Sequence, residues 1–203
     1  MNPDELLAIH EAGHAVIAEL LYLNPEYVTI EPSYRADGHL KRRFPPISAQ
    51  ERWRELLFLC AGVVAEGIRS EEVEPYEKLR WPGDVGTDSG RLWASLQSRS
   101  DDQRQQQVWF DSAFFQTQRI LSNSAVWRSV ESLAWRLLEA RTLGGWEAAS
   151  LIDAALGHSR WGRDRFKMGN RYASPPQTWI ESREERWQVK KAMAASAAGG
   201  ATR

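Results

Sequence analysis

The sequence predicts a mainly α-helical domain with a small β-hairpin near its N-terminus. Apolar residues recur at helical spacing over most of the first 156 residues. One short stretch, Tyr27 to Ile30, is instead rich in the aromatic and β-branched residues that strands favour. A turn signal at Ala36-Asp37-Gly38 separates it from a second short segment, His39 to Arg43, so we expect the two segments to pair.

The first two helices are marked by their ends. We expect one to begin near Pro3, because proline suits the first helical turn, and to stop before Pro25. The next is predicted to run from Ala49 to about Arg69. Its start is indicated by Ser48 and Glu51, which have the spacing of a capping box.

The rest of the chain divides into a loop, further helices and a tail. Prolines and glycines predict a long loop from Ser70 to Gly86. Further helices are predicted from Asp88, from about 102 to 121, from about 125 to 141, and from 146 to 156. Residues 142–145, Thr-Leu-Gly-Gly, break the pattern before the last of them. Periodicity then fades, so residues 1–157 are predicted to form one domain and residues 158–203 a basic, partly flexible tail.

The composition excludes several classes of protein. A formal net charge of −1 gives no reason to expect a nucleic-acid partner. No stretch of about 18 residues is apolar and free of charge, so we expect no membrane segment, no secretory signal and a cytoplasmic location. The one cysteine, Cys60, lies in an apolar run and is predicted to be buried and unreactive. Six tryptophans in helical patterns are predicted to pack in the core or at helix contacts: Trp53, Trp93, Trp109, Trp127, Trp135 and Trp146.

The first helix carries the strongest chemical signal, His10-Glu11-Ala12-Gly13-His14. Residues four apart project from one side of a helix, so both imidazoles can reach one Zn²⁺ ion. In such an H-E-x-x-H helix the glutamate, here Glu11, is predicted to act as the general base that activates a zinc-bound water. Gly13 costs about 1 kcal/mol of helix stability relative to alanine. Its presence fits the close approach of a neighbouring element.

A catalytic zinc site also needs a third protein ligand and an open position. Three further residues are poor candidates for this ligand. Cys60 lies in an apolar run, His39 lies on a predicted strand, and His158 begins the predicted tail. Three carboxylates are better candidates, namely Glu66, Asp84 and Asp88. Glu66 is a lone acid deep in a predicted helix and should be paired or bound to metal. Asp88 could instead cap the helix that it begins, so spacing alone leaves the choice open.

Several segments resemble, in order, the peptidase domain of the FtsH-type ATP-dependent zinc proteases. The resemblance covers about residues 4–156. It rests on His10–Val16, Tyr27–Pro32 followed by Gly38, Leu59–Glu66, Gly86–Asp88, Ile120-Leu121, Leu133–Leu138 and Thr142–Gly145. Many zinc peptidases share the first motif, but the ordered set is much more specific.

The resemblance implies a zinc-dependent metalloendopeptidase that cleaves unfolded or flexible polypeptides. It implies that Asp88 is the third ligand and that Glu66 orients a ligand imidazole through its free N–H. Asp84 stays an alternative ligand, because the turn before Asp88 departs from the family's glycine spacing. The family holds an extended substrate on an exposed strand edge, which here would be Tyr27–Glu31 or His39–Arg43.

The family also has features that this sequence lacks. FtsH-type proteases carry an ATPase module, yet this sequence has no G-x-x-x-x-G-K-[ST] loop. We therefore expect any ATP-driven unfolding to come from a separate ATPase partner. The family's ring assembly implies a homo-oligomer. A second hypothesis is a catalytically silent relative that acts as a binding or regulatory module, although a structural zinc site would not need Glu11. A third is a metal-free helical protein.

Overall fold

The computed structural model describes residues 2–23, 25–32, 39–42, 48–70, 74–157 and 174–179. Its helices are α1 (Pro3–Leu20), α2 (Ala49–Arg69), α3 (Pro75–Arg80), α4 (Asp88–Gln97), α5 (Gln103–Leu121), α6 (Ser124–Ala140) and α7 (Gly145–Leu156). Its strands are β1 (Pro25–Thr29), β2 (His39–Arg42) and β3 (Thr142–Gly144). The predicted fold class, mainly helical with a small β element near the N-terminus, is confirmed. Among the described helices, none is long and apolar enough to cross a membrane.

The two helices that cross the core both begin with a capping box. In α2 the Ser48 hydroxyl accepts the backbone N–H of Glu51 at 3.1 Å, and the Glu51 carboxylate accepts the backbone N–H of Ser48 at 2.7 Å. This confirms the capping prediction. In α1 the same reciprocal pattern links Asn2 and Glu5. Such caps satisfy backbone N–H groups that have no partner within the helix.

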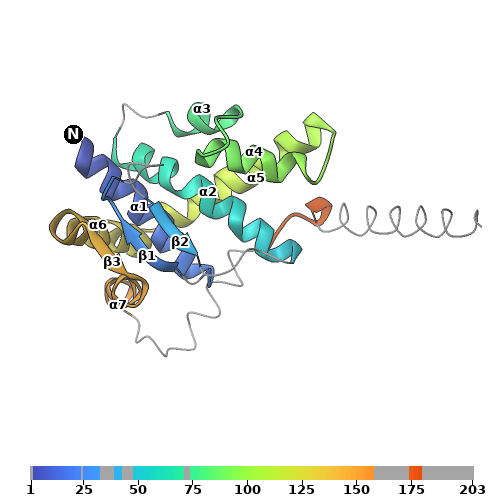
Figure 1. Cartoon of the computed structure of the whole chain (residues 1–203). Helices are drawn as coiled ribbons and strands as arrows, with labels where there is room; N and C mark the ends of the chain where they lie inside the picture. The colour runs from blue at the N-terminus through green and yellow to red at the C-terminus, as the bar shows by residue number, and fades with distance from the viewer. Residues whose placement is uncertain are drawn as a thin grey trace, which may run out of the picture.

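Helix α1 is the centre of the molecule. Residues 11–20 are all buried, as expected of a helix that is covered on every side. It packs mainly against α2 and α6, while α2 packs in turn against α5 (Figure 1). A Cβ atom added at Gly13 would lie 2.7 Å from the Cβ atom of Ala65 and 2.8 Å from the carbonyl oxygen of Ala61. The glycine therefore lets α1 and α2 approach closely, as its cost in helix stability suggested.

The sheet has three antiparallel strands in the order β2-β1-β3. The predicted hairpin partners are confirmed as β1 and β2, although the turn signal between them lies outside the described residues. The pairing of β3 with β1 was not predicted, because residues 142–145 were interpreted only as a helix break. Since β1 is paired on both sides, the prediction that Tyr27–Glu31 offers an open edge to substrate is wrong.

The predicted loop from Ser70 to Gly86 contains a short helix, α3. Leu79 at its end is 1% exposed, and its carbonyl oxygen accepts the indole N–H of Trp93 at 2.8 Å. The loop prediction is therefore wrong for residues 75–80. It failed because one buried leucine and one tertiary hydrogen bond hold a helix too short to show periodicity.

Only part of the tryptophan prediction holds. Trp53, Trp93 and Trp109 are buried, and Trp127 packs partly buried against the core. Trp135 and Trp146, by contrast, are each 65% exposed, so the core prediction is wrong for them. In the predicted tail, residues 174–179 pack against the helical body through Trp179, which is fully buried. The other residues between 158 and 203 lie outside the described part of the chain.

Candidate metal centre

Three side chains from two helices converge on one point. His10 and His14 project from α1, and Asp88 is the first residue of α4. The Asp88 Oδ2 atom lies 2.8 Å from His14 Nε2 and 3.2 Å from His10 Nε2. The two Nε2 atoms lie 3.1 Å apart. Among the residues that the structure describes, these three form the group that could bind a metal ion.

The opposite nitrogen of each imidazole is held by an oxygen atom. His10 Nδ1 lies 2.7 Å from the carboxylate Oε1 atom of Glu66, and His14 Nδ1 lies 2.8 Å from the carbonyl oxygen of Phe58. A carbonyl oxygen and an ionised carboxylate can only accept, so each Nδ1 atom is the donor. In a metal-bound site each ring would be neutral and would direct the lone pair of Nε2 toward the point where Asp88 lies, which is the usual orientation of a metal-bound histidine.

This donor set fits a zinc ion. Two imidazole lone pairs and a carboxylate oxygen that face one another at about 3 Å repel unless a proton or a metal cation lies between them. Two nitrogen ligands and one oxygen ligand are a common set for zinc with an open fourth position. The His14 side chain is 4% exposed, whereas those of His10 and Asp88 are each 18% exposed. The group is therefore reached from the side of His10 and Asp88.

The charges around the group explain its proton affinities. Burial lowers the pKa of His10, but the hydrogen bonds and charges of Asp88 and Glu66 outweigh burial and raise it to about 10. Burial alone would raise the pKa of Asp88, yet the two histidines hold it well below its usual range. Burial likewise acts to raise the pKa of Glu66, but His10 and Lys78 lower it. Without metal, the group therefore holds a proton on His10.

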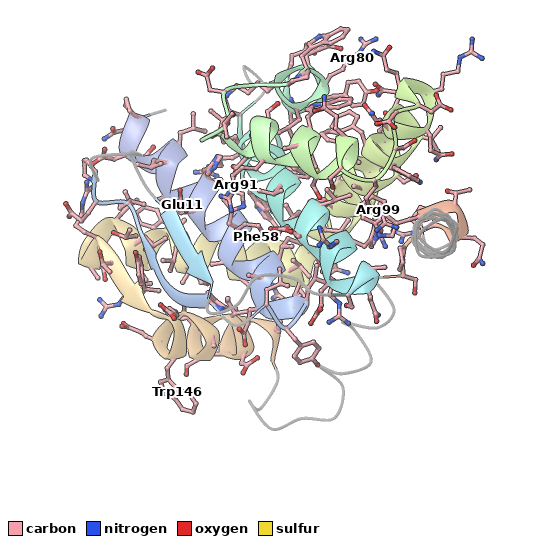
Figure 2. The ribbon with its side chains drawn as sticks, turned by 45° about the vertical axis from the view of Figure 1, so that its right-hand side comes forward. Glu11, Phe58, Arg80, Arg91, Arg99 and Trp146 are labelled. Atoms are coloured by element: carbon pink, nitrogen blue, oxygen red, sulfur yellow. The ribbon has the colours of Figure 1, made fainter. Side chains whose placement is uncertain are left out.

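The predicted general base is buried beside the ligands. Glu11 is 4% exposed and follows His10 on α1. Its charge contributes to the raised pKa of His10, which shows that the two groups are close enough to interact. Figure 2 shows Glu11 on α1, Phe58 on α2 and Arg91 on α4 gathered in one region of the molecule. A carboxylate in this position could accept a proton from a water molecule held at the metal.

The first turn of α4 fixes Asp88 in place. The N-cap is Thr87, whose hydroxyl accepts the backbone N–H of Gly90 at 3.1 Å. Asp88 is therefore not the cap of its helix, which was the alternative interpretation. The Thr87 hydroxyl also donates to the backbone carbonyl of Asp84 at 2.7 Å. Asp84 itself is exposed, and the structure does not bring it into the ligand group.

Two supports of the centre were missed by the sequence analysis. The carbonyl oxygen of Phe58 holds His14, and a backbone atom gives no sequence signal. At Gly62 on α2, an added Cβ atom would lie 2.4 Å from His10 Nε2 and 2.5 Å from His14 Nε2. The signal for Gly62 was its cost in the middle of a helix, the same signal that was used for Gly13.

Of the remaining cysteine and histidine residues, the structure describes the surroundings of Cys60 alone. Cys60 is fully buried, as predicted, and burial raises the pKa of its thiol, which keeps it protonated and unreactive. His39 belongs to β2, and His158 lies outside the described residues.

Comparisons with known proteins do not assign the chain to a family. No protein-family model matches it, and no curated protein matches it either.

Proposed function

We propose that the protein is a zinc-dependent metalloendopeptidase. The observation that carries the proposal is the convergence of His10 Nε2, His14 Nε2 and Asp88 Oδ2, with Glu11 buried beside them. In this proposal these three atoms hold zinc. A bound zinc ion supplies Lewis acidity, which makes a water molecule easier to deprotonate and a carbonyl carbon easier to attack.

Glu11 performs the proton transfers in this proposal. It takes a proton from the attacking water and delivers it to the nitrogen of the departing amine, so that it ends the cycle ionised. Its place on α1 next to the proposed ligand His10 supports this role, because a general base must lie close to the water that it deprotonates. Glu66 keeps His10 in the tautomer that presents Nε2.

The substrate class comes from the resemblance to FtsH-type proteases. Unfolded or flexible polypeptides are the proposed substrates, and a separate ATPase partner and a homo-oligomer remain predictions of that resemblance. The cytoplasmic location also remains a prediction. Since β1 is paired on both sides, β2 is the candidate edge for an extended substrate on that side of the sheet.

The test compares zinc content and cleavage of casein in three proteins: the wild type, Glu11→Gln and Asp88→Asn. The wild type should bind one equivalent of zinc and cleave casein. Glu11→Gln should keep the zinc and lose about 10²- to 10⁴-fold in turnover, because it removes the base and no ligand. Asp88→Asn should lose both zinc and turnover.

A matched control is Glu139→Gln, which neutralises a carboxylate that is 69% exposed on α6. It should behave as the wild type in both measurements. Full activity of Glu11→Gln would overturn the mechanism. Bound zinc with no turnover in the wild type would favour the silent binding module, and no zinc at all would favour the metal-free alternative.

A further inference from the structure

A tryptophan that follows the helical body in sequence is buried in a slot between α2 and α5. Trp179 is fully buried, with its ring centroid 5.5 Å from that of Trp53 and 5.1 Å from that of Trp109. The guanidinium carbon of Arg99 lies 4.1 Å from the Trp179 ring centroid, within cation–π range. Figure 2 shows Arg99 on the side of the body where this segment lies.

Polar contacts in the slot recognise both the indole and the main chain. The indole N–H of Trp179 donates to the carbonyl oxygen of Ala49 at 2.9 Å. Arg99 donates to the carbonyl oxygen of Trp179. One residue earlier, the Thr178 hydroxyl accepts the indole N–H of Trp109 at 3.1 Å. A phenylalanine would keep the ring contacts but leave the Ala49 carbonyl without this donor.

The walls of the slot are held together without the segment that fills it. The indole N–H of Trp53 donates to Gln116 at 3.0 Å, which ties α2 to α5. The next residue on α5, Thr117, donates its hydroxyl to the carbonyl oxygen of Leu57, one turn further along α2, at 3.1 Å. In sequence, residues 158–173 separate the segment from the end of α7. The segment therefore resembles a tethered peptide in a preformed site.

We propose that this slot is a peptide-binding site for a Thr-Trp pair, occupied by residues 174–179 of the same chain as a latch on α2 and α5. Because the segment belongs to the same chain as the slot, its binding is intramolecular, so a modest intrinsic affinity keeps it bound. The latch contacts Ala49 in the first turn of α2. The same helix carries Phe58 and Glu66. In this proposal the bound segment stabilises α2, and with it the two residues that hold the imidazoles of His10 and His14. This proposal does not depend on the proposed enzymatic function.

The test removes the Trp179 side chain from the slot and then adds a peptide that carries the same tryptophan. Trp179→Ala in the full chain should lower Tm by roughly 5–10 °C, because a fully buried indole is lost. The control Trp146→Ala removes an indole that is 65% exposed and should leave Tm within about 1 °C of the wild type. A synthetic peptide with the sequence of residues 174–179 is then titrated into Trp179→Ala by calorimetry. It should bind saturably and restore part of the lost Tm.

The same peptide with alanine in place of tryptophan should not bind. Equal Tm values for Trp179→Ala and Trp146→Ala would overturn the latch, and equal binding of the two peptides would overturn the binding site. If Trp179→Ala does not fold, Trp179→Phe decides, because it keeps an aromatic ring in the slot. Its Tm should lie below that of the wild type, because the carbonyl oxygen of Ala49 loses its donor, and a Tm equal to that of the wild type would overturn the proposal.

Discussion

At the scale of single residues, the two imidazoles of the metal centre are oriented by acceptors of different chemistry. His14 Nδ1 is held by a backbone carbonyl at Phe58, whereas His10 Nδ1 is held by the carboxylate of Glu66. A carboxylate makes the ring that it holds more basic and a stronger metal ligand than a carbonyl does. In the proposed zinc site the two imidazoles on α1 would therefore be unequal ligands, and Glu66 would be the residue through which zinc affinity could be tuned.

Replacing Glu66 by glutamine tests this inequality. Glu66→Gln should weaken zinc binding by about 10- to 100-fold, because the His10 ring loses its charged partner. A competition titration with a zinc chelator measures the change. Lys78→Met is the matched control, since it removes the other partner of Glu66, 2.9 Å away, and leaves His10 untouched. Equal zinc affinities for Glu66→Gln and the wild type would show that Glu66 has no role in orienting the ligand.

The proton on His10 predicts how the metal-free protein responds to pH. Its pKa is raised to about 10 in the folded state, so its contribution to stability is complete below about pH 6.5 and is lost as pH rises toward 10. Asp88 acts in the opposite direction. Its pKa is lowered, so its contribution is present above about pH 4 and is lost in acid.

Urea unfolding of the metal-free protein should therefore give a free energy that falls between about pH 6.5 and pH 10. In His10→Gln this fall should be much smaller, because the variant has no titrating imidazole at that position. Both proteins are measured with chelator present, so that zinc does not compete with the proton. Parallel pH profiles for the two proteins would contradict the assignment of the proton to His10.

At the scale of elements, the centre depends on the close contact of α1 and α2. Gly13 on α1 and Gly62 on α2 both face the opposite helix without space for a Cβ atom. At Gly62 the nearest atoms belong to the imidazoles of His10 and His14, and they include both Nε2 atoms of the candidate metal centre. The close packing of α1 on α2 and the placement of the two imidazoles therefore both require a glycine at position 62.

Gly62→Ala should separate zinc affinity from helix stability. Alanine raises helix propensity by about 1 kcal/mol but displaces the imidazoles, so zinc affinity should fall by at least about tenfold. Circular dichroism should still show a helical protein. Gly86→Ala is the matched control, because no atom lies within 4 Å of a Cβ atom added there. Wild-type zinc affinity in Gly62→Ala would contradict the close contact.

Sequence patterns predict the long helices and the β1–β2 pair of this fold but not the helix α3 or the strand β3. The ends of α2 could be predicted because Ser48 and Glu51 form a local signal. The strand β3 could not, because three residues that follow a helix gain their structure only by pairing with β1. The pair His10 and His14 was visible from helical spacing, but the place of Asp88 beside them depends on how α4 packs, which no local pattern encodes.

At the scale of the whole molecule, a bound zinc ion would link α1 to α4. Without it, both of these helices pack on α2. A ligand that binds only the folded state stabilises it by about 4 kcal/mol when its concentration is 1,000 times Kd. For a chain of this size that corresponds to a rise in Tm of roughly 10 °C. Adding zinc to the chelated protein in a thermal scan should produce this rise. Asp88→Asn should show little or no rise, and an equal rise in that variant would place the metal elsewhere.

The distance in sequence between the ligands has a consequence for biosynthesis. His10 and His14 leave the ribosome first, while Asp88 follows more than seventy residues later, and α5, which braces α2, later still. A nascent chain that ends before Asp88 offers a metal ion two imidazoles and no carboxylate from α4. If the protein is the proposed zinc enzyme, metal loading would be a late step in its maturation, and a product of premature termination before α4 would lack the three-residue group.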